Sequence, residues 1–185
     1  MVLAVSEEVE VLKMVTGRLD AVGIPYMVTG SMALNYYAVP RMTRDIDVVV
    51  ELSTPDADRM CDLFRDDFYI EPETVRESVE KRGTCNIIHM ALVVKVDLVV
   101  RKDSEYRRTE FARRRKVSLE GHPFFIVAPE DLVISKIDWA KDTRSEVQLA
   151  DARNLLRSTP GLDRPYLERW TTRLGLEALY REVSQ

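Results

Sequence analysis

The chain has 185 residues, of which 45% are apolar and 31% charged, and 27 Lys plus Arg stand against 31 Asp plus Glu. This composition indicates a folded protein with one sizeable core and excludes disordered, collagenous and low-complexity chains. The net charge of −4 provides no general attraction to nucleic acid, although a local basic segment can still supply one.

The first half of the chain predicts alternating helices and strands. Ser6, followed by two glutamates and apolar residues at helical spacing, caps an amphipathic helix that Gly23 ends. Pro40 stops the helix that follows Thr29-Gly30-Ser31. The expected order is a helix over 6–23, a strand over 24–28, a helix over 31–37, a strand over 45–52, a helix over 54–67, a short strand over 68–70 and a helix over 72–81.

The second half predicts further strands and then a wholly helical end. Pro129 opens the first of its last helices, and no strand pattern follows. We therefore expect a core over 1–128 and a C-terminal helical subdomain over 129–185. The expected elements are strands over 85–91 and 93–101, a helix over 103–115, strands over 117–119 and 124–127, and helices over 131–141, 146–157 and 164–181.

Membrane, disulfide and zinc sites have little support in the sequence. Charges interrupt the long apolar runs well before the ~20 residues of a membrane span, and no signal-peptide pattern precedes the first helix, so we expect a cytoplasmic protein without membrane contact. Cys61 and Cys85 form no metal-binding pattern and are expected to be buried reduced thiols. His89 and His122 are interpreted as structural residues.

Two aspartates lie in an otherwise β-branched strand, in the sequence Asp45-Ile46-Asp47. Residues at i and i+2 of a strand point to one face of the sheet. An unpaired buried carboxylate is strongly unfavourable, and a divalent cation would compensate for both charges. Mg²⁺ prefers oxygen ligands and is commonly completed by waters and substrate phosphates. The spacing is therefore typical of a magnesium site that also receives a nucleoside triphosphate.

A third carboxylate, Asp97, repeats this pattern in a later β-branched strand. If the two strands are neighbours, Asp45, Asp47 and Asp97 surround one or two metal ions in the arrangement used for in-line phosphoryl displacement, with Asp97 as candidate general base. Gly30 permits close approach of the backbone, and Ser31 begins a helix whose free N–H groups can hold a phosphate.

The alternative is that each feature is structural. A D-x-D pattern arises by chance, and an acid at a strand end is commonly solvated or paired. The joint order of strand, Gly30-Ser31, helix, Asp45-x-Asp47 and a later strand with Asp97 favours the functional interpretation.

These motifs, over residues 24–101, resemble those of the nucleotidyltransferase superfamily with the polymerase-β-like fold. The run from Arg41 to Asp47 is also similar to the R-x-T-x-D-I-D form of minimal enzymes that include AbiEii-like and MenT-like toxins. The resemblance implies an α+β fold, in which helices flank a mixed sheet, with a C-terminal helical extension. It also implies Mg²⁺-dependent transfer of a nucleotidyl group from a triphosphate such as ATP. Gly30 and Ser31 would then contact the triphosphate.

Four further charged residues are candidates for the same site. Arg41 and Arg44 can hold phosphate oxygens through the guanidinium fork, or can form salt bridges to the aspartates. The resemblance to AbiEii-like proteins implies a phosphate-binding role for Lys136 and a later motif position for Asp151. The alternative for Lys136 is a lysine that extends past its apolar neighbours into water. The alternative for Asp151 is a solvated helical acid.

A basic segment runs from Arg101 to Lys116, with eight basic residues and three acids, and is densest over Arg107–Lys116. It can grip an RNA backbone, dock an acidic protein such as an acceptor or antitoxin, or form a solvated helix.

The sequence leaves two classes of function open. One is an active nucleotidyltransferase whose hydroxyl acceptor is RNA, protein or a small molecule such as an amino sugar, including a toxin of a toxin–antitoxin system. The other is a catalytically inactive module with the same fold that acts by binding a partner. Nucleotide binding that depends on Mg²⁺ and on the aspartates discriminates between them.

Overall fold

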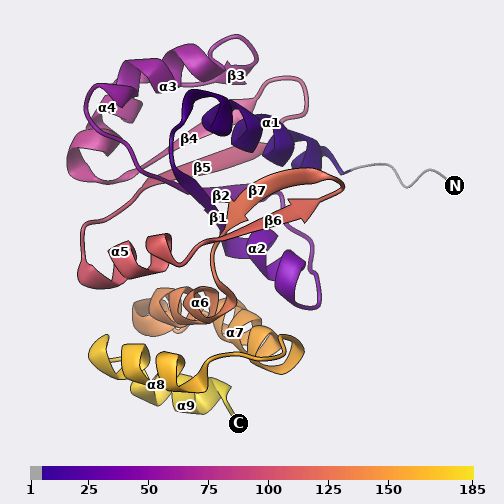
Figure 1. The fold of residues 1–185 in the computed structure, drawn as a ribbon, viewed down its shortest axis with the longest axis vertical. Helices are drawn as coiled ribbons and strands as arrows, with labels where there is room; N and C mark the ends of the chain where they lie inside the picture. Colours follow the sequence, from indigo (N-terminus) through magenta and orange to yellow (C-terminus); the bar gives the residue numbers. More distant parts are fainter. Residues whose placement is uncertain (1–5) are drawn as a thin grey trace, which may run out of the picture.

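The computed structural model describes residues 6–185, which form one seven-stranded sheet with helices on both sides (Figure 1). The strand order is β3-β4-β5-β2-β1-β7-β6, with β2 parallel to β5 and β1 parallel to β7, and the other neighbours antiparallel. The predicted α+β fold with a mixed sheet is confirmed. The strands are β1 (Tyr26–Thr29), β2 (Asp45–Val50), β3 (Phe68–Tyr69), β4 (Thr84–His89), β5 (Lys95–Val100), β6 (Arg115–Leu119) and β7 (His122–Ile126).

The helices begin and end where the sequence supplies the corresponding signals. The Ser6 hydroxyl accepts a hydrogen bond from the Val9 amide at 3.3 Å, and Gly23, at φ +70°, ends the first helix. The described helices are α1 (Glu7–Val22), α2 (Gly30–Tyr37), α3 (Asp56–Phe64), α4 (Pro72–Lys81), α5 (Glu105–Ala112), α6 (Pro129–Thr143), α7 (Glu146–Ser158), α8 (Arg164–Arg173) and α9 (Glu177–Val183).

The two faces of the central strands differ sharply in burial. In β2, Ile46, Val48 and Val50 are fully buried, whereas the residues between them are not. The strand β5 alternates in the same way. Helices α1, α3 and α4 lie over one side of the sheet, and α2, α5 and the C-terminal helices lie on the other (Figure 1). The apolar residues of β2 and β5 thus form the core with one helical layer, while their polar residues face the opposite side.

The C-terminal helices continue the core of the sheet domain. Buried apolar residues form one cluster that extends from α1 to α9, and α6 is buried along most of its length. The expectation of one helix over 164–181 is wrong. Gly175 adopts φ +69° and ends α8, and the Leu176 amide bonds back to the Thr171 carbonyl before α9 begins. The division of the chain at residues 128 and 129 stays a prediction.

The cysteines and histidines have structural surroundings. Cys85 is buried as expected, but Cys61 is only partly buried, and both are free thiols. His89 accepts a hydrogen bond from the Leu92 amide, and His122 shares one with Thr16. None of the helices between residues 6 and 185 has the length and apolarity needed to cross a bilayer.

Candidate active site

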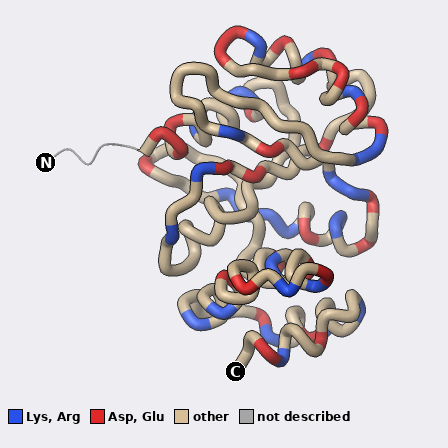
Figure 2. Tube along the Cα trace, turned by 180° about the vertical axis from the view of Figure 1, so that it is seen from behind, with Lys and Arg blue, Asp and Glu red and all other residues tan. Residues whose placement is uncertain are grey.

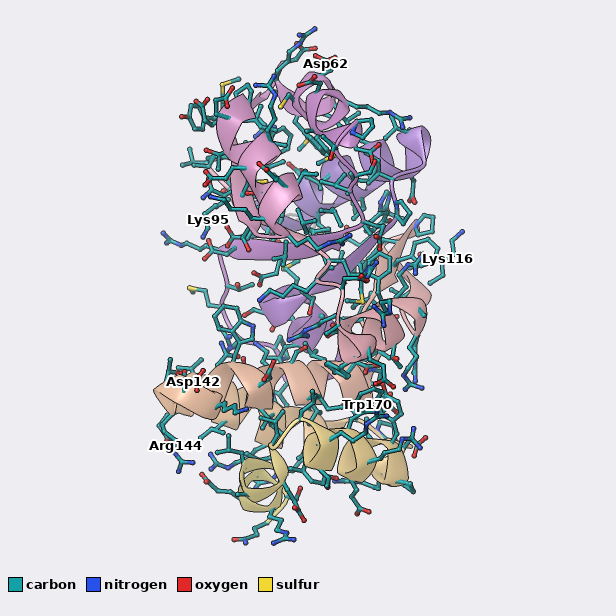
Figure 3. All side chains as sticks on the ribbon, turned by 90° about the vertical axis from the view of Figure 1, so that its left-hand side faces the viewer. Asp62, Lys95, Lys116, Asp142, Arg144 and Trp170 are labelled. Carbon is teal, nitrogen blue, oxygen red and sulfur yellow. The ribbon has the colours of Figure 1, made fainter. Side chains whose placement is uncertain are left out.

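The sheet register brings the three predicted aspartates together. Asp47 of β2 lies directly opposite Asp97 of the parallel strand β5, and Asp45 lies opposite Lys95. Because side chains two residues apart share a face, all four point to the side of the sheet away from α1, α3 and α4. Figure 3 shows Lys95 on the sheet layer and Asp142 on the helical layer, on the same side of the molecule. The acids therefore occupy the polar face between the sheet and the C-terminal helices.

The surroundings of Asp47 disfavour its ionised form. Burial raises its pKa, and the negative charges of Asp97 and Asp45 raise it further, while Lys136 and Lys95 act in the opposite direction. A carboxylate in this position gains from any cation that approaches it, because the cation removes both the burial cost and the repulsion.

Lys95 is a member of this cluster that the sequence interpretation missed. Its ammonium lies 2.9 Å from the Asp97 carboxylate and 3.5 Å from that of Asp45. The hydrogen bond to Asp97 raises the pKa of Lys95, so the side chain remains charged. Within residues 6–185, no three His, Cys, Asp or Glu side chains stand at the spacing of a metal site. The signal was available, since Lys95 stands two residues before Asp97.

Gly30 is fixed by its contact with Asp47. It adopts φ +64°, and a Cβ atom built at this position would lie 1.9 Å from an Asp47 carboxylate oxygen. Thr29, in contrast, has an ordinary extended φ of −139° that any residue adopts. The turn therefore requires glycine at position 30 and not at position 29. The turn places the first residue of α2 against the central aspartate.

The beginning of α2 exposes the groups that hold an anion. Thr29 provides no side-chain hydrogen bond to cap α2, so the first N–H groups of the helix keep their hydrogen-bonding capacity. These donors and the positive end of the helix dipole lie next to Asp47. A phosphate bound to these N–H groups would lie beside the Asp47 carboxylate.

Arg41, Lys136 and Asp151 form one connected group with Ser31. Asp151 of α7 accepts hydrogen bonds from Arg41 Nε and Nη2, both at 2.9 Å, and lies 2.8 Å from the ammonium of Lys136 in α6. Arg41 Nη2 also donates to the Ser31 hydroxyl at 2.7 Å. Burial would raise the pKa of Asp151, but the hydrogen bonds from Arg41 and Lys136 outweigh it and lower the pKa. This network joins the C-terminal helices to the start of α2.

Arg44 lies apart from this network. It is exposed and, within residues 6–185, forms no ion pair. It lines a cavity of about 570 Å³, together with residues of α1 and α2, and none of the three aspartates lines this cavity. Of the two arginines before Asp45, only Arg41 contacts residues of the predicted site.

The basic segment is largely neutralised by internal ion pairs. Arg107 contacts Glu110 and Asp138, each at 2.9 Å, and Arg113 contacts the fully buried Asp131 at 2.9 Å. Arg108 and Arg115 also pair with carboxylates. Figure 2 shows acidic and basic residues interspersed along the whole trace. The contacts of Arg107 with Asp138 and of Arg113 with Asp131 join the α5 segment to α6. Binding of RNA or of an acidic protein by the basic segment stays a prediction.

The site suits a hard divalent cation and a polyphosphate. Its acidic donors are carboxylate oxygens, which Mg²⁺ prefers, and Lys95 contacts one oxygen of Asp45 and one of Asp97. The start of α2 lies against Asp47, and Ser31 joins it to Arg41 and through Arg41 to the Asp151–Lys136 pair. The geometry therefore combines an oxygen-rich cation site with an anion site.

Several solved structures share this fold. A nucleotidyltransferase-like protein from Paracoccidioides brasiliensis is 15% identical, over 93% of this chain and 91% of its own, with a TM-score of 0.56. The lincosamide antibiotic adenylyltransferase LnuA, bound to lincomycin, is 10% identical over 84% of this chain and 99% of its own, with a TM-score of 0.56. The antibiotic-resistance factor ANT(2'')-Ia is 13% identical over 95% of this chain and 91% of its own, with a TM-score of 0.54.

At these identities the likeness establishes the fold. The chain has the fold of the nucleotidyltransferase superfamily, as its motifs predicted. No family model and no curated protein matches its sequence. The narrower resemblance to AbiEii-like and MenT-like enzymes stays a prediction.

Proposed function

We propose that this chain transfers a nucleoside monophosphate from a nucleoside triphosphate to a hydroxyl acceptor, with Mg²⁺ held by Asp45, Asp47 and Asp97. The observation that carries the proposal is the contact of Gly30 with Asp47, because it sets an uncapped helix N-terminus directly beside the central carboxylate. Nucleotidyl transfer needs a triphosphate and a cation-binding acid cluster at one place.

The proposed roles follow from position. The N–H groups at the start of α2 and the Ser31 hydroxyl bind the β- and γ-phosphates, and Arg41 and Lys136 neutralise their charge. When bound, Mg²⁺ supplies positive charge at the α-phosphate. Asp97 accepts the proton of the acceptor hydroxyl as its oxygen bonds to the α-phosphorus, and the bond from that phosphorus to pyrophosphate breaks. Most of the rate enhancement then comes from positioning and charge neutralisation.

The test is calorimetric titration with each nucleoside triphosphate, with and without Mg²⁺, on the wild type and on Asp47→Asn. We expect Mg²⁺-dependent binding of at least one triphosphate, weakened by more than about tenfold in the variant. Asp62→Asn is the matched control, because Asp62 is an exposed acid on α3, in the helical layer on the other side of the sheet (Figures 1 and 3). A wild type that binds no triphosphate under any metal condition contradicts the proposal and favours a binding module without catalysis.

The same variant separates loss of function from loss of fold. The pKa of Asp47 is raised in the folded state, so its charge opposes folding above that pKa, and the cost disappears as the pH falls through the unfolded value near 4. Without metal at pH 7, Asp47→Asn should therefore raise the free energy of unfolding by on the order of 0.5–2 kcal/mol. Urea denaturation at pH 7 and pH 4 measures this gain, which should vanish at the lower pH. Destabilisation at pH 7 would contradict the assigned surroundings of Asp47.

A further inference from the structure

We propose that Lys95 is a fixed cation of the acid cluster that takes the place of a second divalent ion, so that the nucleotide-loaded site holds one Mg²⁺. This inference rests on the proposed function and concerns how the same site is charged. Lys95 is a positioning residue in it, since it acts on the reacting groups through Asp45 and Asp97.

The sheet itself fixes the position of Lys95. The residue lies opposite Asp45 in the parallel ladder of β2 and β5, and two residues before Asp97 on the same strand. Its backbone is therefore held by the central strands, and its ammonium reaches both carboxylates. No loop movement is needed to bring the charge to the cluster.

The contacts of Lys95 use the carboxylate oxygens that a second ion would need. An ion that used these same oxygens, which lie 3.5 and 2.9 Å from the ammonium, would have to displace the lysine. Such an ion would also approach a like charge. Within the described residues, Lys95 contacts one oxygen of Asp45 and one of Asp97 and forms no ion pair with Asp47, so the Asp47 carboxylate and the second oxygens of the other two acids stay available to the first ion.

The lysine also keeps the charge of the cluster low in the absence of metal. Asp45, Asp47 and Asp97 carry three negative charges on adjacent strands, and Lys95 cancels one of them.

The experiment is a Mn²⁺ titration followed by electron paramagnetic resonance, which counts free Mn²⁺ directly. It is carried out on the full chain with one equivalent of a non-hydrolysable triphosphate analogue, at a chain concentration well above the dissociation constant, so that little free analogue remains to bind Mn²⁺; its readout is independent of turnover. We expect one Mn²⁺ bound per chain in the wild type and two in Lys95→Met, which removes the charge but keeps most of the side chain. Lys95→Arg, which retains the charge, should bind one.

Lys81→Met is the matched control, because Lys81 forms an exposed ion pair with Glu77 on α4, on the far side of the sheet. It should bind one Mn²⁺, as the wild type does. Thermal melting without metal verifies that each variant folds, and Lys95→Met should melt lower than the wild type by a margin that Mn²⁺ closes.

The outcomes separate this inference from the proposed function. Two Mn²⁺ ions in the wild type, or one in Lys95→Met, overturn the role of Lys95 while the metal site stands. Absence of Mn²⁺ binding from the wild type and from all Lys95 variants overturns both.

Discussion

At the scale of single residues, Gly30 is the position where the backbone and the chemistry are most closely coupled. A methyl group there meets the Asp47 carboxylate at 1.9 Å and also disfavours the backbone at φ +64°. We expect Gly30→Ala to lower the free energy of unfolding by about 1–2 kcal/mol and to weaken Mg²⁺-dependent triphosphate binding by more than about tenfold, because Asp47 must move. Calorimetry and urea denaturation measure the two effects.

Gly161→Ala provides the control for this prediction. Gly161 adopts a similar φ of +71°, but nothing lies within 4 Å of the position that an added methyl group would take. The control should show the backbone cost without the binding defect. Equal loss of binding in both variants would show that the contact with Asp47 is irrelevant to the site.

The aspartates show how far single residues can be predicted from the sequence. Period-two alternation predicted that Asp45 and Asp47 share a face, because the apolar residue between them required the other face, but the inclusion of Asp97 was conditional on the two strands being neighbours. The same rule applies to Lys95, but a lysine in a strand is ordinary until the register places it opposite Asp45. Register depends on pairing between strands far apart in sequence, which spacing alone does not supply.

At the scale of secondary-structure elements, the pair Lys136–Asp151 ties α6 to α7 in a buried setting. Each side chain is only 5% exposed. Asp151→Leu leaves the Lys136 ammonium buried without its partner, so we expect a loss of about 3–5 kcal/mol in the free energy of unfolding. The double variant Lys136→Met with Asp151→Leu should recover most of that loss, because no unpaired buried charge remains.

Urea denaturation of the two single variants and the double variant measures this coupling energy. The pKa of Asp151 is lowered in the folded state, so its stabilising contribution is present above the unfolded value near 4 and disappears as the pH falls through the lowered pKa. The difference between wild type and Asp151→Leu should therefore shrink in acid. If the double variant is as unstable as Asp151→Leu, the pair is not the source of the cost.

The same scale shows where the sequence misleads. The basic residues of α5 and β6 meet carboxylates of α6 that stand up to 31 positions away, such as Asp138 opposite Arg107. Their compensation is a result of tertiary packing and could not be predicted from local charge. The end of α8, however, was predictable, because Leu174-Gly175 is a typical helix C-terminus. Because the helical pattern continues on both sides of Gly175, the sequence predicted a single helix.

At the scale of the whole molecule, buried polar contacts fasten the C-terminal helices to the rest of the protein. Asp131 of α6 is fully buried and accepts hydrogen bonds from Tyr166 of α8 at 2.6 Å and from Arg113, which follows α5, at 2.9 Å. The same helices also share one apolar core with the sheet and its other helices. The molecule should therefore unfold in one transition.

The two tryptophans allow this expectation to be measured. Trp139 of α6 is 71% exposed, whereas Trp170 of α8 is buried. In Trp139→Phe, the fluorescence of Trp170 reports on α8 alone, and its urea midpoint should coincide with that of far-ultraviolet circular dichroism. Separate midpoints would show that residues 129–185 unfold as an independent subdomain.

The alternation along β2 and β5 also constrains how such a chain can diverge. Because the core uses one face and the acids use the other, polar-face residues can be exchanged while the packing against α1, α3 and α4 is retained. An insertion of one residue within β2 would instead turn Ile46 and Val48 toward water and the charges toward the core. New chemistry is therefore accessible through substitution in these strands, whereas changes of length are confined to segments outside them, such as residues 38–44.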